Sequence, residues 1–591
     1  SMEESVTKTK IAILDLTGCT GCQVNLLRLG SAFLDFAQYF EISSWRMLQA
    51  GGATDYDVVF VEGYACNEEQ VELLKQARET CELVVAIGVC AISGHVFSQL
   101  TAENYEKLKA IVYSPEHRTV TKFVKPVSNV VKVDHVIPGC PANVEAARKL
   151  LLELKQRHIT SKVKEVRYPD YVARIEGHGS LNVDFKDGTA HFCPEEGERF
   201  VEALVVGKPY LAAPRIHSRI CGICPVAHCL CSIKAIEKAL GIRPSSLSKR
   251  LRRIFQCGQI VQSHLLHLYF MVLPYLTGLK SSVEMSSRYP LEFHLYLDIK
   301  RLTEEIFDLI GGAPLHPVSL TVGGFSKLPD AGRLQGLRGN ILKVLDKAHD
   351  LVALFAGFDW PEAVTNAHML CIQPEFTNTY PMFGERICFN GPIPFSVDDY
   401  RDFIQETIVC NHPSKVGYLA PEKPVKTGAL ARLSRYSHRL NPLAKKAFEA
   451  SRPKFHNPFH NSVAQAVEIL HYLEEAVRLL DTIKGENLRK TVVDRKKIRR
   501  TALDDEGPWP RRGISAIEAP RGLLFHEVQV DKKGNVVYYN IIPPTVLNLS
   551  SFDQEAILLL CTYQSEPNDK KTELLEELIR AMDPCVTCAV H

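Results

Sequence analysis

Short apolar runs alternate with amphipathic segments over the first 160 residues. Four runs have the length and flanking turn residues of buried strands: residues 11–16, 58–61, 83–87 and a short run that ends at Ile137. Segments with helical spacing lie between them, from about Gln23, over Glu68–Thr80 and around residues 102–111. Because strands that alternate with helices form parallel sheets, we predict an α/β, flavodoxin-like doubly wound domain.

The remainder of the chain has longer periodic segments, which are typical of a helical bundle. Composition changes after about His158, and the polar stretch 160–165 is expected to be a linker. Helical spacing predicts helices over residues 227–240, 247–276, 291–310, 334–355 and 464–483, with a closing amphipathic helix at 574–579. Strand-like material at 172–179, a turn at 186–188 and hairpin-like material at 513–542 accompany them. We therefore predict two domains, residues 1–160 and a mainly α-helical (α+β) domain at residues 161–591.

The composition is that of an ordinary globular protein with more than one domain. The chain has 591 residues, too many for one core, of which 46% are hydrophobic and 23% are charged. The net charge of +2 and the lack of a clustered basic surface argue against nucleic-acid binding. The one dense basic stretch, 489–500, is expected to be a solvated connection, with docking of a partner as the alternative.

The sequence also bears on where the protein works. No apolar signal segment or twin-arginine leader precedes the first predicted strand. The longest apolar stretch, 264–276, contains two histidines and a proline and is too short to span a bilayer. We expect a cytoplasmic protein without direct membrane insertion, in which the 18 cysteines are metal ligands and core residues rather than disulfides.

Four cysteines of the first domain directly follow predicted strands. Cys19, Cys22, Cys90 and Cys140 each stand close to glycine or proline. Because the carboxyl ends of parallel strands meet at one edge of a sheet, we expect the four thiols to converge there. Four thiolates from three loops suit a single 4Fe-4S cluster, with zinc as the rival occupant.

Two further cysteine pairs have the two-residue gap that lets one turn present two thiolates to a metal. They are Cys221 with Cys224, and Cys585 with Cys588, and the second pair is followed by His591. Together the pairs could form a tetrathiolate site, with a zinc tetrathiolate as the plain alternative. Because chain ends are normally frayed, metal ligands this close to residue 591 predict that the tail is buried.

The combined motifs resemble those of nickel–iron hydrogenases. Cys221-Gly-Ile-Cys224 with Asp583-Pro-Cys585-x-x-Cys588-x-x-His591 is similar to the paired signature of the large subunit. Cys19-Thr-Gly-Cys22, Gly88-x-Cys90 and Gly139-Cys140-Pro141 are similar to the small subunit around its proximal cluster. The resemblance covers nearly the whole chain and implies that both subunits are joined in one polypeptide. The chain resembles most the cytoplasmic bidirectional (group 3) branch of the family.

The resemblance implies a nickel–iron centre whose iron carries cyanide and carbon monoxide. Cys221 and Cys585 would be terminal thiolates on nickel, and Cys224 and Cys588 would bridge nickel to iron. Soft thiolates suit this assignment because they stabilise low-valent metal. The gap between the two pairs is also far wider than a zinc ribbon requires.

The resemblance assigns roles to residues around this centre. Glu176 matches a proton-relay carboxylate, and His228 matches a histidine that hydrogen-bonds a bridging thiolate. Arg521, after Pro520, matches an arginine that lies over the open coordination site and contacts a cyanide. Thr545 matches the position that hydrogen-bonds the other cyanide. Without the motifs, Glu176 would be interpreted as a surface ion pair and His228 as a packed helix residue.

The resemblance extends to a second metal site, and the sequence departs from the pattern of the family at two positions. Glu202 and His591 match ligands of a magnesium or iron ion that would anchor the tail. Gln23 follows Cys22 where a glutamate is frequent, which puts a polar contact of the small subunit in doubt. Tyr275 replaces a common aspartate at the end of its helix.

The resemblance implies reversible oxidation of H2 to protons and electrons. Electrons would leave through the single cluster to an external acceptor, either ferredoxin or a nicotinamide-reducing diaphorase subunit, and the chain would work in an oligomer or hetero-complex. No G-x-G-x-x-G follows a strand, so the chain itself is not expected to bind a nucleotide or flavin. The alternatives are an H2-sensing protein and the hydrogenase module of a membrane-bound energy-converting complex.

Overall fold

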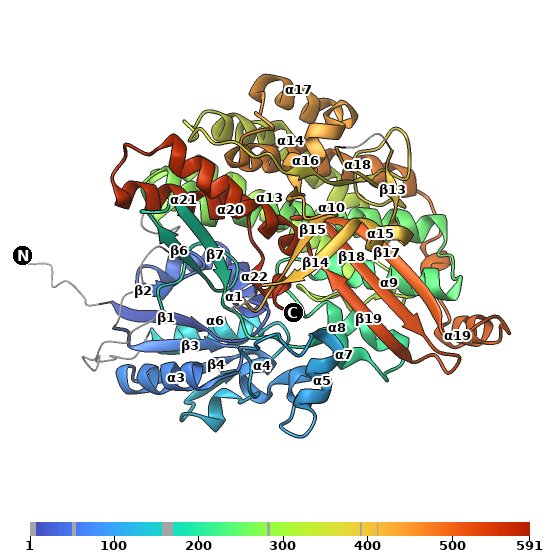
Figure 1. The fold of residues 1–591 in the computed structure, drawn as a ribbon, viewed down its shortest axis with the longest axis horizontal. Helices are drawn as coiled ribbons and strands as arrows, with labels where there is room; N and C mark the ends of the chain where they lie inside the picture. The colour runs from blue at the N-terminus through green and yellow to red at the C-terminus, as the bar shows by residue number, and fades with distance from the viewer. Residues whose placement is uncertain (1–7, 50–54, 156–168, 280–283, 391–392, 410–411) are drawn as a thin grey trace, which may run out of the picture.

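The chain folds into a small part built on a parallel sheet and a larger, mainly helical part (Figure 1). The computed structural model describes residues 8–49, 55–155, 169–279, 284–390, 393–409 and 412–591. We call residues 8–155 the small half and residues 169–591 the large half. The predicted linker at 160–165 and the predicted boundary at residue 160 lie outside the described residues.

Five parallel strands form the sheet of the small half, in the order β2-β1-β3-β4-β5. They are β1 (Thr9–Asp15), β2 (Phe40–Trp45), β3 (Val58–Glu62), β4 (Leu83–Ile87) and β5 (His135–Ile137). This order occurs in doubly wound sheets, and the predicted parallel sheet is confirmed. The sequence does not predict β2, because three of its six residues are Glu41, Ser43 and Ser44.

Helices cover both faces of this sheet. Ile11 of β1 enters a hydrophobic cluster that includes residues of α6 (Val144–Leu154). Its neighbour Ala12 points the other way, into a cluster that includes α3 (Glu68–Thr80). The bounds of α3 are those predicted from its spacing, while α5 (Tyr105–Val112) is shorter and later than predicted. The sheet is thus buried on both faces, and its carboxyl edge is where the loops with cysteines emerge.

Long helices dominate the large half, as predicted. They are α9 (Pro225–Leu240), α10 (Ser246–Leu266), α13 (Pro290–Ile306), α14 (Ala331–Ala356) and α18 (Asn461–Ile483). A π-helical turn, His267–Val272, joins α10 to α11 (Leu273–Leu276), so that the predicted helix 247–276 is one continuous rod with a local change of winding. Helix α18 packs against α10, α14, α16 (Ala429–Tyr436) and α17 (Pro442–Ser451).

Short sheets, most of them antiparallel, complete the large half. The largest consists of β17 (Arg511–Ala519), β18 (Gly522–Val530) and β19 (Val536–Ile542), which packs on α9. A hairpin of β6 (Gly179–Asp184) and β7 (Thr189–Pro194) turns at the predicted position. Smaller pairings involve β8 (Leu320–Thr321), β9 (Gly324–Phe325), β10 (His368–Met369), β11 (Cys371–Gln373), β12 (Arg386–Cys388), β13 (Phe395–Ser396), β14 (Ile404–Ile408), β15 (Lys415–Leu419) and β16 (Val425–Lys426).

The structure differs from the elements predicted from the sequence in three places. Of the strand-like residues 172–179, only Gly179 belongs to a strand. The basic stretch 489–500 is not simply a connection, because α19 (Arg495–Leu503) starts within it, capped by Asp494. Helix α20 (Pro544–Thr562) was not predicted, because polar residues such as Asn548, Ser551 and Glu555 are buried along with its apolar ones, so its sequence has no clear amphipathic pattern.

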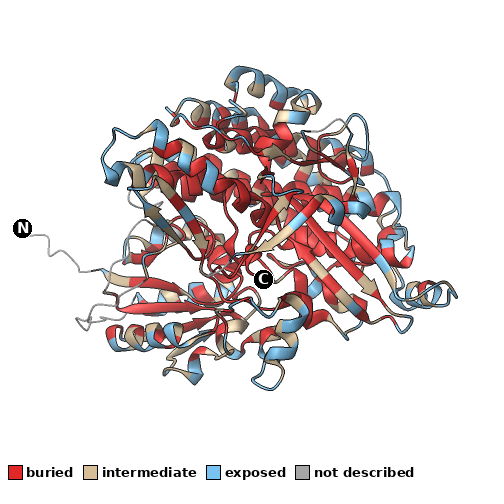
Figure 2. Ribbon diagram, in the orientation of Figure 1, coloured by how far each residue is buried: buried red, intermediate tan, exposed pale blue. Residues whose placement is uncertain are grey.

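The tail of the chain lies inside the molecule. Helix α21 (Asn568–Met582) leads to α22 (Val586–Ala589), and all residues from Ala581 to His591 are buried (Figure 2). The predicted burial of the tail is therefore confirmed. In the described part of the chain, no helix has the length and apolar character needed to cross a membrane.

Candidate functional site

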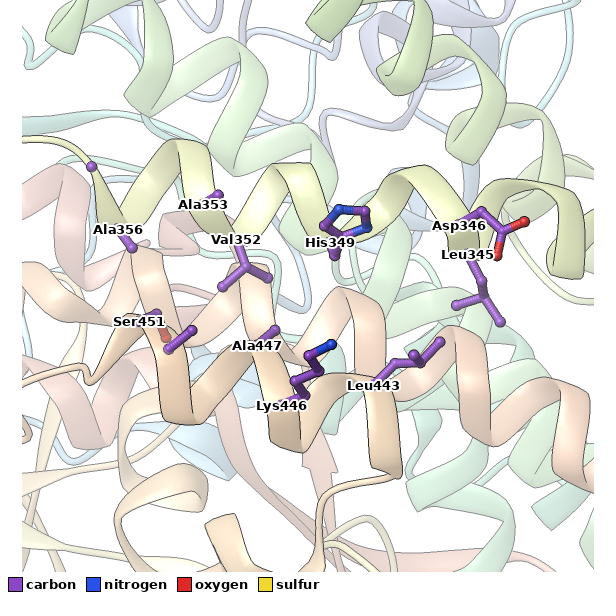
Figure 3. Close-up of a pocket in the computed structure, with 12 residues that line it drawn as sticks. Leu345, Asp346, His349, Val352, Ala353, Ala356, Leu443, Lys446, Ala447 and Ser451 are labelled. Carbon is purple, nitrogen blue, oxygen red and sulfur yellow. The ribbon is translucent and has the colours of Figure 1, made fainter.

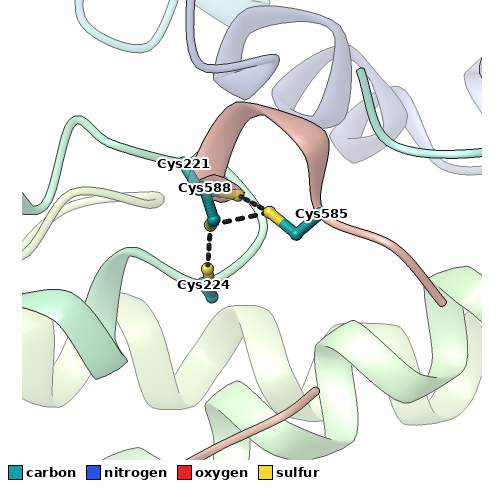
Figure 4. A group of neighbouring side chains, drawn as sticks. All are labelled: Cys221, Cys224, Cys585 and Cys588. Atoms are coloured by element: carbon teal, nitrogen blue, oxygen red, sulfur yellow. Dashed lines mark hydrogen bonds between the residues drawn. The ribbon is translucent and has the colours of Figure 1, made fainter. Parts of the chain in front are cut away.

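Four cysteine side chains meet in the interior of the large half (Figure 4). The Sγ atoms of Cys221, Cys224, Cys585 and Cys588 all lie within 4.8 Å of one another, and all four residues are buried. Sγ of Cys224 lies 3.3 Å from that of Cys588, and Sγ of Cys585 lies 3.3 Å from that of Cys221. Two motifs that are 364 residues apart in the chain thus form one thiol group suited to binding soft metals.

A helix begins at each cysteine pair. Cys224 is the N-cap of α9, and Cys585 is the N-cap of α22. Helix N-termini and backbone N–H groups favour thiolates, and the N–H of Ile223 donates to Sγ of Cys221 at 3.2 Å. Although burial opposes ionisation, hydrogen bonds from the neighbouring thiols lower the pKa of Cys221 well below its usual range. Cys221 therefore favours the thiolate, which is the form that binds metal, whereas burial and the neighbouring thiols raise the pKa values of Cys585 and Cys588.

The loop of the first pair touches the small half directly. The N–H of Gly222 donates to the carbonyl of Cys19 at 2.6 Å. A Cβ atom at Gly222 would lie 2.1 Å from Cα of Gly21, so only glycine allows this approach. Two of the three C-x-x-C loops, at residues 19–22 of the small half and 221–224 of the large half, are therefore in backbone contact.

Glu176 lies between the loop at residues 19–22 of the small half and the loop at residues 585–588 of the large half. It is fully buried, and its carboxylate accepts hydrogen bonds from Oγ1 of Thr20 at 3.0 Å and from the N–H of Thr587 at 3.1 Å. Thr20 lies inside one C-x-x-C loop and Thr587 inside another. Burial and the nearby charge of Cys221 raise the pKa of Glu176 to about 8. A carboxyl with such a pKa can exchange protons near neutral pH.

Arg521 places an unsatisfied cation beside the four cysteines. Nε donates to Oδ1 of Asp583 at 2.9 Å, but Nη1 and Nη2 are buried without a hydrogen-bond partner among the described residues. Although burial lowers the pKa of Arg521, the charges of Asp583, Cys585 and Cys221 raise it well above its usual range, so the guanidinium lies near the thiols. Buried donors without partners cost free energy, so they indicate room for an anionic group that is not part of the chain.

His228 contacts the thiol group from α9. Its Nε2 lies 3.5 Å from Sγ of Cys588, and its Nδ1 lies 3.2 Å from Nε2 of His526. Burial lowers the pKa of His228 to about 3, so the ring is neutral at physiological pH. The hydrogen bonds continue from His526 to the hydroxyl of Tyr539 at 2.9 Å. His228 thus contacts Cys588 while the next ring orients it.

Pro520 and Thr545 lie on the framework around the thiols. The hydroxyl of Thr545 accepts from the N–H of Cys585 at 2.9 Å, so it holds the second cysteine loop. The carbonyl of Pro520 accepts from Nη2 of Arg432 at 3.0 Å. Asn548, one turn after Thr545, donates to the carbonyl of Arg521 at 3.3 Å.

Glu202 and His591 are in direct contact. Oε1 of Glu202 lies 2.6 Å from Nε2 of His591, and Nδ1 of His591 lies 2.7 Å from the carbonyl of Cys588. Both residues are buried, and Oε2 of Glu202 has no hydrogen-bond partner among the described residues. This arrangement fixes the tail and leaves a carboxylate oxygen available for a cation.

The four cysteines of the small half gather at the carboxyl edge of its sheet. Cys19 and Cys22 are buried, and Cys90 and Cys140 are half-buried. Burial and the charge of Glu62 raise the pKa of Cys19 most, and the charges of Cys90 and Cys140 raise it further. These thiols therefore lie near one another. A Cβ atom at Gly88 would lie 2.3 Å from Sγ of Cys22, so glycine is required for the close approach of this loop.

The two departures from the resemblance have structural partners. Oε1 of Gln23 accepts from Nε1 of Trp45 at 2.9 Å, and its N–H donates to Glu62 at 3.2 Å. Tyr275 lies under the guanidinium of Arg580, which is 5.1 Å from the ring centroid. Gln23 thus supports the small-half loop, and Tyr275 joins α11 to α21.

The sequence reasoning missed several residues of this site. Thr20 and Thr587 occupy the variable positions of the C-x-x-C motifs, where a motif gives no signal. Arg199 is buried and donates to the carbonyls of Arg219, Ile220 and Thr587, so it joins both cysteine loops of the large half. Asp583 begins the motif that contains Cys585 and Cys588, so its position could have indicated that it pairs with Arg521.

A surface groove lies away from these residues. It has a volume of about 640 Å³ and runs between α14 and α17, with Leu345, Val352 and Leu443 on its walls (Figure 3). None of the candidate residues lines it. The groove is therefore separate from the two cysteine groups.

Family models match both halves of the chain. Residues 19–154 match the family described as NADH ubiquinone oxidoreductase, 20 Kd subunit. Residues 199–275 and 421–591 match the family described as nickel-dependent hydrogenase. The first match contains the four small-half cysteines, and the second contains the four buried cysteines of the large half. Both kinds of subunit therefore occur in one polypeptide.

Named relatives and solved structures agree with these matches. The chain is 32% identical over 428 residues to sulfhydrogenase 1 subunit alpha of Pyrococcus furiosus, which covers 71% of this chain and 97% of that protein. It is 26% identical over 471 residues to the beta subunit of the NAD-reducing hydrogenase of Cupriavidus necator, covering 71% of this chain and 94% of that subunit.

The fold is similar to that of a crystal structure of an NAD+-reducing [NiFe]-hydrogenase, with a TM-score of 0.62 and 23% identity over 72% of this chain and 98% of the other. A nickel–iron–selenium hydrogenase from Desulfovibrio vulgaris Hildenborough gives a TM-score of 0.58 with 22% identity, over 72% of this chain and 99% of that one. The match to the sulfhydrogenase subunit spans nearly the full length of that subunit, and the match to the nickel-dependent hydrogenase model includes all four buried cysteines of the large half. The chain belongs to the nickel-dependent hydrogenase family.

Proposed function

We propose that this chain catalyses the reversible oxidation of H2 to protons and electrons at a nickel–iron centre held by Cys221, Cys224, Cys585 and Cys588. The observation that carries the proposal is the group of four buried thiols beside a buried guanidinium with unpartnered donors. Residues 1–160 would act as the small-subunit-like part and residues 161–591 as the large-subunit-like part. The two family matches support this division.

The donor set fits a nickel–iron centre. Cys221, Cys224, Cys585 and Cys588 would hold the two metals, because soft thiolates bind nickel and low-valent iron well. When bound, such a centre supplies the redox-active, Lewis-acidic site at which H2 is split. The unpartnered Nη1 and Nη2 atoms of Arg521 fit a cyanide on the iron, and Pro520 and Thr545 would border the other diatomic ligands.

Glu176 carries protons away from the four cysteines. Its carboxylate is hydrogen-bonded on one side to Thr587, next to Cys588, and on the other side to Thr20 of the small half. The carboxylate accepts a proton, and the hydroxyl of Thr20 offers the next hydrogen-bonded position. The raised pKa of Glu176, about 8, suits an acid–base group that works near neutral pH.

His228 and the tail support the centre. His228 orients the thiolate of Cys588 through Nε2 and tunes its basicity. Glu202 and His591 hold a magnesium or iron ion, which the unpartnered Oε2 of Glu202 would bind. This ion would fix the tail and thereby the second cysteine pair.

Electrons leave through the small half. Cys19, Cys22, Cys90 and Cys140 would hold one 4Fe-4S cluster, and their first loop contacts the large half where the N–H of Gly222 donates to the carbonyl of Cys19. The half-buried positions of Cys90 and Cys140 bring the cluster near the surface. The acceptor is an external protein, either a ferredoxin or a nicotinamide-reducing partner subunit; the relative in Cupriavidus necator is named as NAD-reducing.

Metal analysis combined with infrared spectroscopy tests the proposal. Anaerobically purified protein should contain about one nickel and about one cubane cluster per chain, with cyanide and carbonyl bands in the infrared. Under H2 it should reduce a viologen dye continuously. Zinc in place of nickel, with no such bands, would contradict the proposal. Nickel with the bands but without sustained dye reduction would instead indicate an H2 sensor.

A further inference from the structure

The side chain of Arg521 projects from a two-residue turn that must be held rigidly. Pro520 and Arg521 connect β17 to β18, and Ala519 pairs with Gly522 across the hairpin. A turn has few backbone hydrogen bonds of its own, so its conformation depends on its neighbours. A displacement of about 1 Å at a catalytic position can cost two orders of magnitude in rate.

Arg432 lies beneath this turn. It projects from α16 and is completely buried. Nη1 donates to the carbonyl of Ala519 at 3.1 Å, and Nη2 donates to the carbonyl of Pro520 at 3.0 Å. These are the two carbonyls that immediately precede Arg521. Arg432 is thus bound to the backbone of the turn at the two positions that set the direction of the next residue.

Two carboxylates occupy the other donors of Arg432. Glu468 of α18 accepts from Nε at 2.7 Å and from Nη2 at 2.6 Å, and Glu518 of β17 accepts from Nη1 at 2.8 Å. A guanidinium has five N–H donors, and all five therefore have acceptors. Burial would raise the pKa of Glu468, but Arg432 overrides this and the pKa is lowered to about 2. Arg432 and Glu468 are consequently ionised inside the protein, whereas burial raises the pKa of Glu518.

The carboxylate of Glu468 also contacts two residues from other parts of the chain, His264 of α10 and Tyr380. Nε2 of His264 lies 2.7 Å from Oε2, and the hydroxyl of Tyr380 donates to Oε1 at 2.7 Å. Buried ion pairs contribute little net stability compared with apolar side chains of the same size. A network of this extent therefore needs an explanation beyond stability, and the turn that it binds supplies one.

We infer that Arg432 is a positioning residue for Arg521: its guanidinium holds the carbonyls of Ala519 and Pro520 and so directs the Arg521 side chain toward the four cysteines. Arg432 touches neither the thiols nor any reacting atom in the described contacts. Its effect on the reaction passes through the turn. This inference rests on the proposed role of Arg521.

A second line of contacts from the same helices supports Arg521 from its other side. Nε of Arg521 donates to Oδ1 of Asp583, and Nε2 of Gln465 donates to Oδ2 of the same carboxylate at 2.9 Å. Gln465 lies one turn before Glu468 on α18, and its side chain contacts His267, which lies three residues after His264. Adjacent turns of one helix thus hold the backbone and the side chain of Arg521.

Lysine should not replace Arg432. An ammonium retains the charge but has three donors and lacks the planar fork that binds Glu468 and two carbonyls together. The substitution Arg432→Lys therefore preserves the charge balance and removes the fixed geometry. The chain offers a matched control in Arg252, which is buried on α10 and donates to both oxygens of Glu237 at 3.0 and 2.7 Å and to the carbonyl of Thr321.

The test compares Arg521→Lys, Arg432→Lys and Arg252→Lys in the purified holoenzyme. The readouts are the infrared cyanide bands, kcat for H2-dependent dye reduction, and Tm. We expect Arg521→Lys to shift the cyanide bands and to lower kcat by about 10²–10³-fold. Arg432→Lys should shift the same bands in the same direction and lower kcat by about 10–100-fold. Arg252→Lys should lower Tm but leave the bands and kcat unchanged.

Two outcomes separate the inference from the proposed function. If Arg521→Lys shifts the bands while Arg432→Lys lowers only Tm, Arg432 is a structural residue and the inference is wrong. If Arg521→Lys itself leaves the bands unmoved, the proposed role of Arg521 is wrong. Should Arg432→Lys not fold, Glu468→Gln serves instead, since it removes the charge that fixes Arg432 while keeping the size of the side chain. The same band shift is then expected, and an unshifted spectrum overturns the inference.

Discussion

The two cysteine groups of this chain differ in what surrounds them. In the large half, Cys221, Cys224, Cys585 and Cys588 are fully enclosed, and Arg521, His228 and Glu176 supply a cation, a neutral ring and a carboxyl around them. In the small half, two of the four cysteines are half-buried. Their neighbours include the N–H of Ala142, which donates to Sγ of Cys22 at 3.4 Å, and the ring of His316, whose Nε2 lies 3.8 Å from Sγ of Cys19.

This difference matches the chemistry that we propose for each group. Splitting H2 releases protons and requires anionic ligands to be held, so acid–base groups and cations are needed around the first group. A cluster that passes electrons needs neither, and it gains from a position near the surface. The comparison therefore predicts that damage to the first group abolishes H2 chemistry, whereas damage to the second group only interrupts electron flow.

The largest expected effect comes from removing a ligand of the first group. Cys221→Ser should prevent nickel incorporation and reduce both dye reduction and H2/D2O exchange to background, because a hydroxyl is a poor ligand for soft metals. Nickel content and isotope exchange measure this effect. Cys257→Ala, at a buried cysteine of α10 outside both groups, is the control and should keep the metal and the activity. Full nickel content in Cys221→Ser would remove this residue from the ligand set.

The corresponding change in the second group should be more selective. Cys140→Ser should remove the cluster and reduce H2-dependent dye reduction to background, yet leave nickel content and H2/D2O exchange close to those of the wild type. The physical reason is that isotope exchange needs proton transfer but no net electron transfer. Electron paramagnetic resonance and mass spectrometry of HD check both parts. Loss of exchange together with dye reduction would show that the two groups are not separable as we describe.

How far the sequence predicts this arrangement depends on the range of the contacts. Local patterns predict α3, β3 and β4 almost to the residue, because apolar runs bounded by polar turns leave little ambiguity. Strand β2 and helix α20 are not predicted, because β2 lacks an alternating pattern and the polar residues of α20 are not separated from its apolar ones. In both, tertiary packing decides the outcome.

The candidate site shows the same limit more sharply. Motifs indicate the eight cysteines and Glu176, because spacing within a loop is visible in a sequence. No spacing indicates that Glu176 contacts Thr20, 156 residues earlier, and Thr587, 411 residues later. No motif indicates the network of Arg432 for the same reason, since Arg432, Glu468, Glu518 and His264 come from four separate elements. Contacts across such distances can be read only from a structure.

A third prediction concerns the proton path between the groups. Glu176→Gln keeps both hydrogen-bond partners but cannot exchange a proton, so it should lower H2 oxidation by about 10²–10⁴-fold with metal contents unchanged. The pKa of Glu176 is raised to about 8 by burial and Cys221, so the carboxyl is mostly protonated at neutral pH. Because it must be ionised to accept a proton, the wild-type rate of H2 oxidation should rise with pH through about 8.

The pH profile provides the decisive comparison for Glu176. The rise through pH 8 should be absent in Glu176→Gln, which cannot ionise at this position. Glu198, another fully buried carboxylate, accepts from the N–H groups of Val120 and Thr121 and lies outside the path, so Glu198→Gln should retain the rise. An unchanged rate and profile in Glu176→Gln would exclude this residue from proton transfer.

The smallest expected effect tests the contact between the two groups. A Cβ atom at Gly21 would lie 3.1 Å from Sγ of Cys19, 3.3 Å from Nε2 of His316 and 3.4 Å from Cα of Gly222. Gly21→Ala should therefore displace the two cysteine loops by a few tenths of an ångström and cost about 1–3 kcal/mol of stability.

Thermal melting and the rate of dye reduction measure the outcome of Gly21→Ala. Gly336→Ala in α14 is the control, because nothing lies within 4 Å of a Cβ atom there, and it should stabilise by about 0.4–1 kcal/mol. A lower rate of dye reduction with unchanged H2/D2O exchange would mean that the close approach of the loops serves electron transfer. A lower Tm with both rates unchanged would mean that the contact only packs the halves together, and the two cysteine groups would then be coupled by another route.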